Sequence, residues 1–227
     1  MGIASLAEQI RRFGAREAFA SLGLRVAERA ADLHVLEVIV IRRVNDEYLR
    51  IEPRYRHGFL DAPTLRSYAR DAIDDFPDSF LDEALSRGDR CYAIREGERL
   101  ASYGWYSRKP TPVDLGGAFQ FDPRYVYMYK GFTHLDYRGR RLHAIGMTWA
   151  LQHVLDEGLL GLVSYVDAAN NSSLKSCYRM GYEHVGRIYA GRVRGRALAL
   201  ADAGARALGV RIVPEDRRAG GVAITAA

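Results

Sequence analysis

Cysteine is nearly absent from this chain of 227 residues, which contains two, Cys91 and Cys177. Two cysteines are too few for a disulfide framework or for a metal cluster built from cysteines. Long apolar runs are also absent, because Glu37 interrupts the best candidate, Val35–Ile41, well short of the roughly 20 residues of a membrane-spanning helix. The first residues lack the charged-then-apolar order of a signal peptide, and Leu6 departs from the myristoylation pattern. We therefore expect a cytoplasmic globular protein that neither crosses a membrane nor holds a metal.

Lysine is also scarce, because only three of the 33 basic residues are lysines and the rest are arginines. Against 28 acidic residues this gives a formal net charge of +5. Arginine offers a planar fork for phosphate, so nucleic-acid binding is one interpretation. An arginine-rich coding bias is the other, and it suits arginines that are interspersed with acids, as at Arg66, Arg70 and Asp71. We expect a solvated basic surface rather than a nucleic-acid partner.

The first part of the chain predicts helices around one strand. Apolar residues recur at helical spacings over residues 4–33, so residues 1–34 are predicted to form an N-terminal helical extension. Residues 35–42 (VLEVIVIR) are short and β-branched, which favours a strand. The stretch 64–87 predicts two helices separated at Pro77, the second capped by Asp78 or Ser79.

The second part alternates between strand and helix patterns. It predicts, in order, a hairpin over 91–107, a loop over 110–117, strands over 125–133 and 162–166, helices over 142–157 and 172–180, and a strand or hairpin arm over 184–194. The tail 214–227 has little to pack against and is expected to be mobile. This order predicts a single α/β (α+β) domain over residues 35–213, built on a central mixed sheet.

A basic turn between a predicted strand and a predicted helix is the most informative segment. Residues 137–141 read YRGRR and lead into the helix that begins near Leu142. The first turn of a helix has unpaired backbone N–H groups and the positive end of the dipole, so it attracts phosphate oxygens. Gly139 allows a close backbone approach, and three arginines add positive charge. The residues themselves therefore predict an anion or phosphate site here.

The same segment resembles the main motif of the GNAT superfamily of acyl-CoA N-acyltransferases, Arg/Gln-x-x-Gly-x-Gly/Ala between a strand and a helix. Here the motif reads RGRRLHA over 138–144. A second block, NNSSLKSCYRMGY over 170–182, is similar to the Asn-x-x-Ala/Ser block of that family, which ends in Gly-Phe. With the preceding hairpin, the resemblance covers residues 89–192. It implies a central mixed, mostly antiparallel sheet flanked by helices.

The resemblance also implies the positions that hold acyl-CoA. Backbone groups of Phe132 and Thr133 would contact the thioester and pantetheine, and Asn170 and Ser173 would lie beside the pantetheine arm. The pyrophosphate would be held by the turn and the first residues of the helix, namely Arg138, Gly139, Arg140, Arg141, Leu142 and His143.

Two departures from the family pattern concern this site. The later glycines of the motif are Arg141 and His143 here. Binding through backbone amides survives if neither position requires a positive φ, and Arg141 could add a charged contact, but the added bulk could also narrow the loop. The tyrosine that protonates the leaving thiolate stands seven residues after the asparagine in the family. That count gives Cys177 or Tyr178, depending on the asparagine chosen. We take Tyr178 as the candidate acid, with a core or interface tyrosine as the alternative.

A general base is not visible in the strand before the turn, because residues 125–132 (YVYMYKGF) contain no carboxylate. The candidates are His134, Asp122 or a chain of water molecules, and a structural role is the alternative for His134 and His143. Five aromatic residues could line an acceptor pocket, and the alternative is that they belong to the core: Tyr103, Trp105, Tyr125, Tyr127 and Tyr129.

The leading hypothesis is an N-acyltransferase that moves an acetyl or other acyl group from acyl-CoA to the primary amine of a small molecule, by direct attack in a ternary complex. One alternative is a catalytically silent acyl-CoA-binding or regulatory domain. Another is an aminoacyl-tRNA-dependent transferase, suggested by the basic charge alone. The acceptor is not readable from the sequence, and a homodimer is compatible with it.

Overall fold

The computed structural model describes residues 33–69, 76–114, 116–193 and 196–213. A sheet of eight strands in the order β10-β9-β1-β8-β7-β4-β3-β2 forms its centre. These strands are β1 (Leu33–Ile41), β2 (Tyr55–Phe59), β3 (Arg90–Glu96), β4 (Arg99–Ser107), β7 (Tyr125–Thr133), β8 (Gly161–Asp167), β9 (Glu183–Val193) and β10 (Arg196–Ala201). Among the described strands of this sheet, β7 and β8 pair in parallel and every other neighbouring pair is antiparallel. The expected mixed, mostly antiparallel sheet flanked by helices is confirmed.

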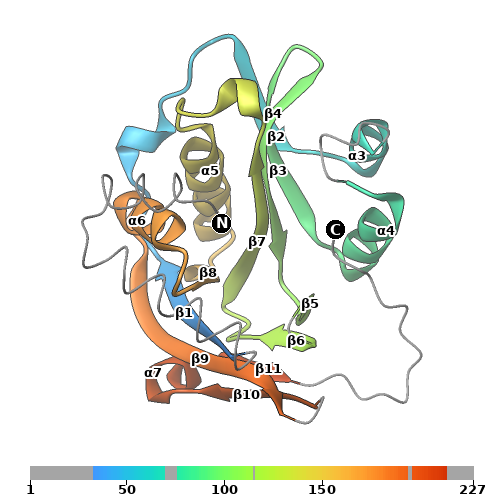
Figure 1. Ribbon diagram of the computed structural model, residues 1–227. Helices are drawn as coiled ribbons and strands as arrows, with labels where there is room; N and C mark the ends of the chain where they lie inside the picture. The colour runs from blue at the N-terminus through green and yellow to red at the C-terminus, as the bar shows by residue number, and fades with distance from the viewer. Residues whose placement is uncertain (1–32, 70–75, 115, 194–195, 214–227) are drawn as a thin grey trace, which may run out of the picture.

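Helices cover both faces of the sheet (Figure 1). On one face lie α5 (Leu142–Asp156) and α6 (Asn171–Met180), and on the other lie α3 (Ala62–Tyr68) and α4 (Asp78–Arg87). The second face is also covered by α7 (Ala203–Ala207) and by a small antiparallel sheet of β5 (Thr111–Val113), β6 (Gly117–Gln120) and β11 (Arg211–Val213). Short 3₁₀ helices, η1 (Asp46–Leu49) and η3 (Leu135–Tyr137), occupy two of the loops.

The core is divided by the sheet because alternate residues of a strand point to opposite faces. In β1, Ile39 and Ile41 pack under α5 and α6, whereas Val38 and Val40 pack against Phe119 on the opposite face. Each such side chain, fully buried, contributes roughly 1.5–3 kcal/mol by leaving water. A third cluster, with Leu81, Cys91 and Trp105 at its centre, fills the space under α3 and α4.

Most elements expected from the sequence are found, but three of the expectations differ from the structure. β1 begins at Leu33, so Leu33 and His34 belong to the sheet and not to the predicted extension. The cap predicted at Asp78 or Ser79 is wrong, because Pro77 occupies the N-cap and makes no side-chain hydrogen bond to the helix. The predicted loop over 110–117 contains β5 and the first residue of β6. The rest of the predicted extension, residues 1–32, and the predicted tail, 214–227, lie outside the described residues.

The described residues contain no helix long and apolar enough to span a bilayer. They also contain no group of three or more histidine, cysteine, aspartate or glutamate side chains placed to hold a metal ion.

Candidate functional site

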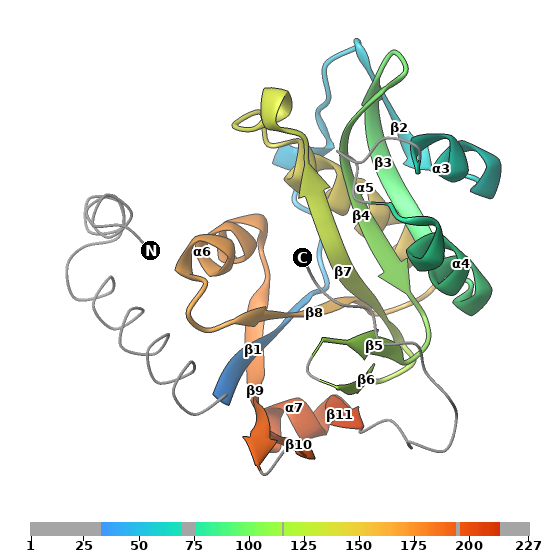
Figure 2. The ribbon, with the colours of Figure 1, turned by 45° about the vertical axis from the view of Figure 1, so that its right-hand side comes forward.

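The parallel pairing between β7 and β8 is short. It joins Tyr125–Tyr127 to Gly161–Val163, and just beyond it the Ser164 hydroxyl donates to the Met128 carbonyl at 2.9 Å. From there the strands diverge, because β7 stays paired with β4 as far as Thr133 while β8 stays paired with β1 as far as Asp167 (Figure 2). Within the described residues, the last part of β7 therefore has an unpaired edge on its β8 side, which we call the open edge of β7.

A β-bulge at Lys130 determines which backbone groups lie on the open edge. Trp105 pairs with Tyr129 and Gly104 pairs with Gly131, so Lys130 is the extra residue, and its φ is +40°. In a regular strand, residues an even number apart face the same edge. Here the Met128 carbonyl faces β8, whereas the amide of His134 donates to the Ala101 carbonyl of β4 at 3.0 Å. Residues 128 and 134 are an even number apart but face opposite edges of β7. The inserted residue therefore changes the edge that each later residue faces, as a bulge does.

This reversal gives different places to the residues predicted to contact the thioester. The Phe132 carbonyl accepts from the Ser102 hydroxyl of β4 at 2.8 Å, and its ring stacks on Tyr103 with centroids 5.5 Å apart. By alternation, Gly131 and Thr133 direct their backbone groups to the open edge. The backbone groups of Thr133 therefore lie at the open edge and those of Phe132 face β4, and the second residue at the open edge is Gly131. A glycine inside a predicted strand was the available signal for this position.

The turn after β7 delivers the start of α5 close to the open edge. Gly139 has a φ of +82° and Arg141 a φ of +59°, and Arg141 is the N-cap of α5 without a side-chain hydrogen bond to the helix. The first backbone bond of α5 runs from the Ile145 amide to the Arg141 carbonyl. The amides of residues 142–144 thus have no carbonyl partner within the helix, which is the arrangement that favours an anion.

The three arginines of the turn point to different partners. Arg138 donates from Nε to the Thr133 carbonyl at 3.4 Å, which keeps it beside β7. Arg140 donates to the Tyr55 hydroxyl at 3.1 Å, and this hydrogen bond raises its pKa. Arg141 pairs with Glu47 at 2.6 Å, and both side chains are 63% exposed. The sequence predicted three charges at one anion site, and the structure directs Arg138 to β7, Arg140 to Tyr55 and Arg141 to Glu47.

Leu142 and His143 are both packed inward from the first turn of α5. Leu142 is buried, so it can offer only its backbone amide to a ligand. The His143 ring lies directly against Gly131, so closely that a β-carbon on Gly131 would overlap it. Burial holds the pKa of His143 below its usual value, against the opposite effect of a hydrogen bond to the Tyr103 backbone. His143 is therefore a neutral imidazole at pH 7, beside the open edge of β7.

The second sequence block forms the start and the body of α6. Asn170 is the N-cap, and its side-chain oxygen accepts from the Ser173 amide at 3.2 Å and from the Ser172 hydroxyl at 2.9 Å. Both residues predicted to lie beside pantetheine, Asn170 and Ser173, thus belong to the helix cap that follows the end of β8.

Cys177 and Tyr178 face different neighbours. Cys177 packs into the cluster under α5 and α6, and burial raises the pKa of its thiol to about 11. Tyr178 is 44% exposed. Partial burial and the nearby Glu37 carboxylate raise the pKa of Tyr178, while Arg187 acts in the opposite direction. Glu37 and Arg187 belong to β1 and β9, so Tyr178 lies on the β1–β9 side of α6.

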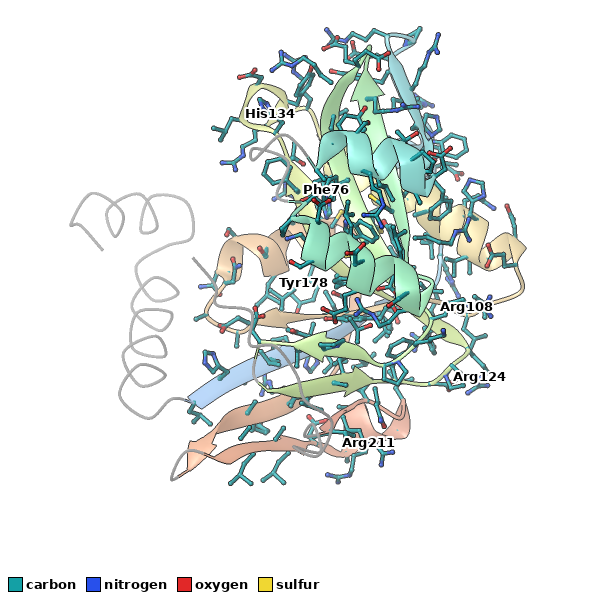
Figure 3. All side chains as sticks on the ribbon, turned by 90° about the vertical axis from the view of Figure 1, so that its right-hand side faces the viewer. Phe76, Arg108, Arg124, His134, Tyr178 and Arg211 are labelled. Carbon is teal, nitrogen blue, oxygen red and sulfur yellow. The ribbon has the colours of Figure 1, made fainter. Side chains whose placement is uncertain are left out.

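The candidate bases named from the sequence both have local partners. Asp122 binds Arg124 at 2.7 Å, and its hydrogen bonds with the side chain and backbone of Arg124 lower its pKa. His134 accepts from the Asp136 amide at 3.3 Å and caps η3. Figure 3 shows Arg124 and His134 at opposite ends of β7.

Four of the five aromatic residues expected to line an acceptor pocket are buried in the core. The exposed fractions are 2% for Tyr103, 0% for Trp105 and 4% for both Tyr125 and Tyr127. These values agree with the alternative that they are core residues. Tyr129 differs, because it is only partly buried and lies where the cluster around Phe119 meets the one under α3 and α4.

The Asp89 carboxylate, which no pattern in the sequence indicated, binds the hydroxyl of Tyr129. The Tyr129 hydroxyl donates to Asp89 Oδ2 at 2.6 Å, and Arg87 donates to the same oxygen at 2.8 Å from Nη2. Asp89 precedes Tyr129 by forty positions. No local pattern could have joined the two, because the contact exists only once β3, β4 and β7 lie side by side.

No protein-family model and no curated protein matches this chain. Solved structures similar to it include a putative GNAT-family acetyltransferase from Novosphingobium aromaticivorans, with 18% identity, a TM-score of 0.46, and coverage of 74% of this chain and 63% of that one. A GNAT-family acetyltransferase from Colwellia psychrerythraea shows 14% identity and a TM-score of 0.48, with coverage of 74% and 60%. AAC(6')-Iy, in complex with the bisubstrate analogue CoA-S-monomethyl-acetylneamine, shows 13% identity and a TM-score of 0.46, with coverage of 57% and 91%.

This chain thus spans about three fifths of the length of the two GNAT-family structures, and most of AAC(6')-Iy. The family whose motifs the sequence resembles is also the one named for these two structures.

Proposed function

We propose that this protein is an acyl-CoA-dependent N-acyltransferase that acts on the primary amine of a small molecule. One observation carries the proposal. The open edge of β7, with the backbone groups of Gly131 and Thr133 directed to it, lies next to the uncapped N-terminus of α5. Backbone donors at this edge suit a thioester and an extended pantetheine chain, and the helix start suits the pyrophosphate.

The residues of the turn fit the anionic part of such a ligand. A β-carbon placed on Gly139 would meet nothing within 4 Å, so the loop backbone is accessible there. Arg138 lies beside Thr133 and adds a positive charge between the open edge and the helix start. When bound, acyl-CoA would supply the acyl group as an activated thioester. The chain itself would orient the thioester carbonyl through the amides of Gly131 and Thr133. Tyr178 is the candidate acid that would protonate the leaving thiolate.

Isothermal titration with acetyl-CoA tests the proposal. We expect saturable binding to the wild-type protein. The Arg138→Gln variant should bind roughly tenfold more weakly, because a charge-assisted hydrogen bond to phosphate contributes about 1.5 kcal/mol or more. Arg124→Gln is the matched control, since Arg124 pairs with Asp122 at the opposite end of β7. Absence of binding at millimolar acetyl-CoA contradicts the proposal.

A second candidate, a catalytically silent acyl-CoA-binding domain, is favoured by one feature. The His143 ring packs on Gly131, at a position where the motif has a small residue, and it narrows the space beside the open edge. Thiol release from acetyl-CoA with a panel of amines separates the two functions. Turnover that is lost in Arg138→Gln supports the transferase, whereas binding without turnover supports the silent domain.

A further inference from the structure

Asp89 is a buried carboxylate, and one of its two oxygens has no hydrogen-bond partner among the described residues. Its side chain is 1% exposed, and Oδ2 accepts from Tyr129 and from both Nε and Nη2 of Arg87. Among the described residues Oδ1 has no hydrogen-bond partner, and neither has the indole N–H of Trp105, which pairs with Tyr129 across β4 and β7. Buried polar atoms in native proteins are nearly always paired, so an unpaired carboxylate oxygen points to a proton, a water molecule or a ligand group that belongs there.

The carboxylate is held rigidly at the junction of α4 and β3. Gly88 ends α4 with a φ of +84°, and the Asp89 amide donates to the Ala84 carbonyl at 2.9 Å. Arg87, on the other side of that glycine, is fixed by Glu83 at 2.5 Å as well as by Asp89. The carboxylate therefore keeps its position without help from a ligand.

Tyr129 connects this carboxylate to the open edge of β7. It is the last residue before the bulge, and Gly131 is the first one after it. Burial raises the pKa of Tyr129, so the phenol is neutral. Its proton lies toward Asp89, and its oxygen can accept another hydrogen bond, alongside a longer contact of 3.3 Å from Arg87.

We propose, resting on the proposed function, that Tyr129 and Asp89 form the pair that removes the proton from the acceptor amine. The geometry that carries the proposal is the 2.6 Å bond from a phenol beside the bulge to a buried carboxylate with a free oxygen. Among the described residues, charged groups near the pair include Glu83 and Arg87 of α4. They also include Lys130, whose ammonium lies 4.9 Å from the centre of the Phe80 ring, and that ring lies 6.4 Å from the Tyr129 ring. With Asp89 their formal charges sum to zero, so an amine that enters as a cation makes the site positive, which favours loss of its proton.

The proton balance is simple. One N–H bond of the ammonium breaks and its proton passes to the Tyr129 oxygen, while the phenol proton passes to Asp89, which becomes a carboxylic acid. The amine keeps the electron pair and becomes a nucleophile. Acyl transfer as a whole turns an ammonium and a thioester into an amide, a thiol and one proton. That last proton is the one that Asp89 takes up and later returns to solvent by the same route.

The test uses Asp89→Asn and Tyr129→Phe, with Tyr92→Phe as the matched control. Tyr92 is also a buried tyrosine whose hydroxyl lies 2.7 Å from a side-chain nitrogen, that of His57. The probes are benzylamine, spermidine and glucosamine. Titration calorimetry measures their binding and that of acetyl-CoA, and thiol release measures turnover between pH 7 and pH 10.

We expect both site variants to bind acetyl-CoA as the wild type does, to bind the accepted amine at least tenfold more weakly, and to turn it over at least a hundredfold more slowly at pH 7. In Asp89→Asn, turnover should rise about tenfold per pH unit toward the pKa of the amine, because only amine already neutral in solution can react. Purely structural damage would not produce this recovery, and Tyr129→Phe gives an independent result if Asp89→Asn folds poorly.

The outcomes separate this proposal from the proposed function. Failure of the wild type to bind acetyl-CoA overturns the proposed function. Binding of acetyl-CoA with turnover unchanged in both variants, or lost without recovery at high pH in both, overturns the Tyr129–Asp89 pair alone. Binding of acetyl-CoA with no amine bound or turned over by the wild type also overturns the pair.

Discussion

Arg141 has a backbone conformation that costs an ordinary residue about 1–2 kcal/mol, because its β-carbon crowds the following carbonyl at positive φ. Its salt bridge to Glu47 offsets little of this strain, because both side chains are 63% exposed and such pairs contribute about 0–1 kcal/mol to stability. Binding through this loop was expected from the sequence to tolerate an arginine if the position needed no positive φ, and the structure shows that the position does need one.

We therefore expect Arg141→Gly to be more stable than Arg141→Ala by about 1 kcal/mol, because both lose the salt bridge and only glycine relieves the backbone. Urea unfolding of the two variants gives the difference directly. The reverse order, with alanine the more stable, would show that the backbone at residue 141 is not strained.

Burial of the Cys177 thiol makes the free energy of unfolding depend on pH in the alkaline range. Burial raises the pKa of this thiol from the usual 9.0 to about 11, so the folded state holds the proton that the unfolded state loses first. The contribution of this thiol to stability is complete below pH 9 and disappears as the pH rises through about 11. We expect the free energy of unfolding to fall less steeply between pH 8.5 and 10.5 in Cys177→Ala than in the wild type. Equal slopes would contradict the burial of this thiol.

At the scale of elements, β7 and α5 meet where Gly131 touches His143. A β-carbon on Gly131 would overlap the His143 ring, so Gly131→Ala must displace the ring or the strand. We expect a loss of about 1–3 kcal/mol, as for other overpacked sites. In a protein that already carries His143→Ala, the further change Gly131→Ala should cost much less, because the ring that the new β-carbon would overlap is gone.

Urea unfolding of the four proteins completes a double-mutant cycle for this contact. A coupling energy near zero would mean that the loss arises from the backbone of β7 and not from the contact with α5.

Besides the three residue pairs of the parallel ladder, a side-chain hydrogen bond joins β7 to β8. Ser164 is 8% exposed and donates to the Met128 carbonyl at the point where the strands separate. We expect Ser164→Ala to cost about 1–3 kcal/mol, because the carbonyl loses this donor.

Amide exchange should increase most in residues 125–128 and 161–163 of the Ser164→Ala variant. Ser86→Ala is the control, since the Ser86 hydroxyl bonds a carbonyl at an exposed position and should change stability by less than about 0.5 kcal/mol. A uniform increase in exchange across the molecule would contradict a local role for Ser164.

Elements with a clear period were predictable from the sequence. The alternating tyrosines of 125–133 and the apolar stripe after Leu142 gave β7 and α5 nearly residue by residue. β5 and β11 are three residues long, which is too short for a period to show, and a glycine interrupts β2. The bulge was also hidden, because a single inserted residue changes the phase of a strand without changing its composition.

At the scale of the whole molecule, the sequence predicted one half of the candidate site. The helix start and its basic turn are local, so their residues follow one another along the chain. The second half depends on contacts between distant residues: Asp89 reaches Tyr129 from forty positions away, and His143 reaches Gly131 across the turn. The directions of Arg140 and Arg141 are equally non-local, since their partners, Tyr55 of β2 and Glu47 of η1, precede the motif by more than eighty residues.

The bulge at Lys130 also bears on how this chain can vary in evolution. If Lys130 instead took a regular place in the strand, opposite Gly104, Phe132 and Thr133 would exchange faces, sending a phenyl ring toward α5 and a hydroxyl toward the aromatic cluster under α4. Many side chains could replace Lys130 at modest cost, because the bulged backbone, and not the lysine side chain, sets the face of every later residue of β7. At this place, we expect selection to act on the backbone conformation more strictly than on the identity of the residue.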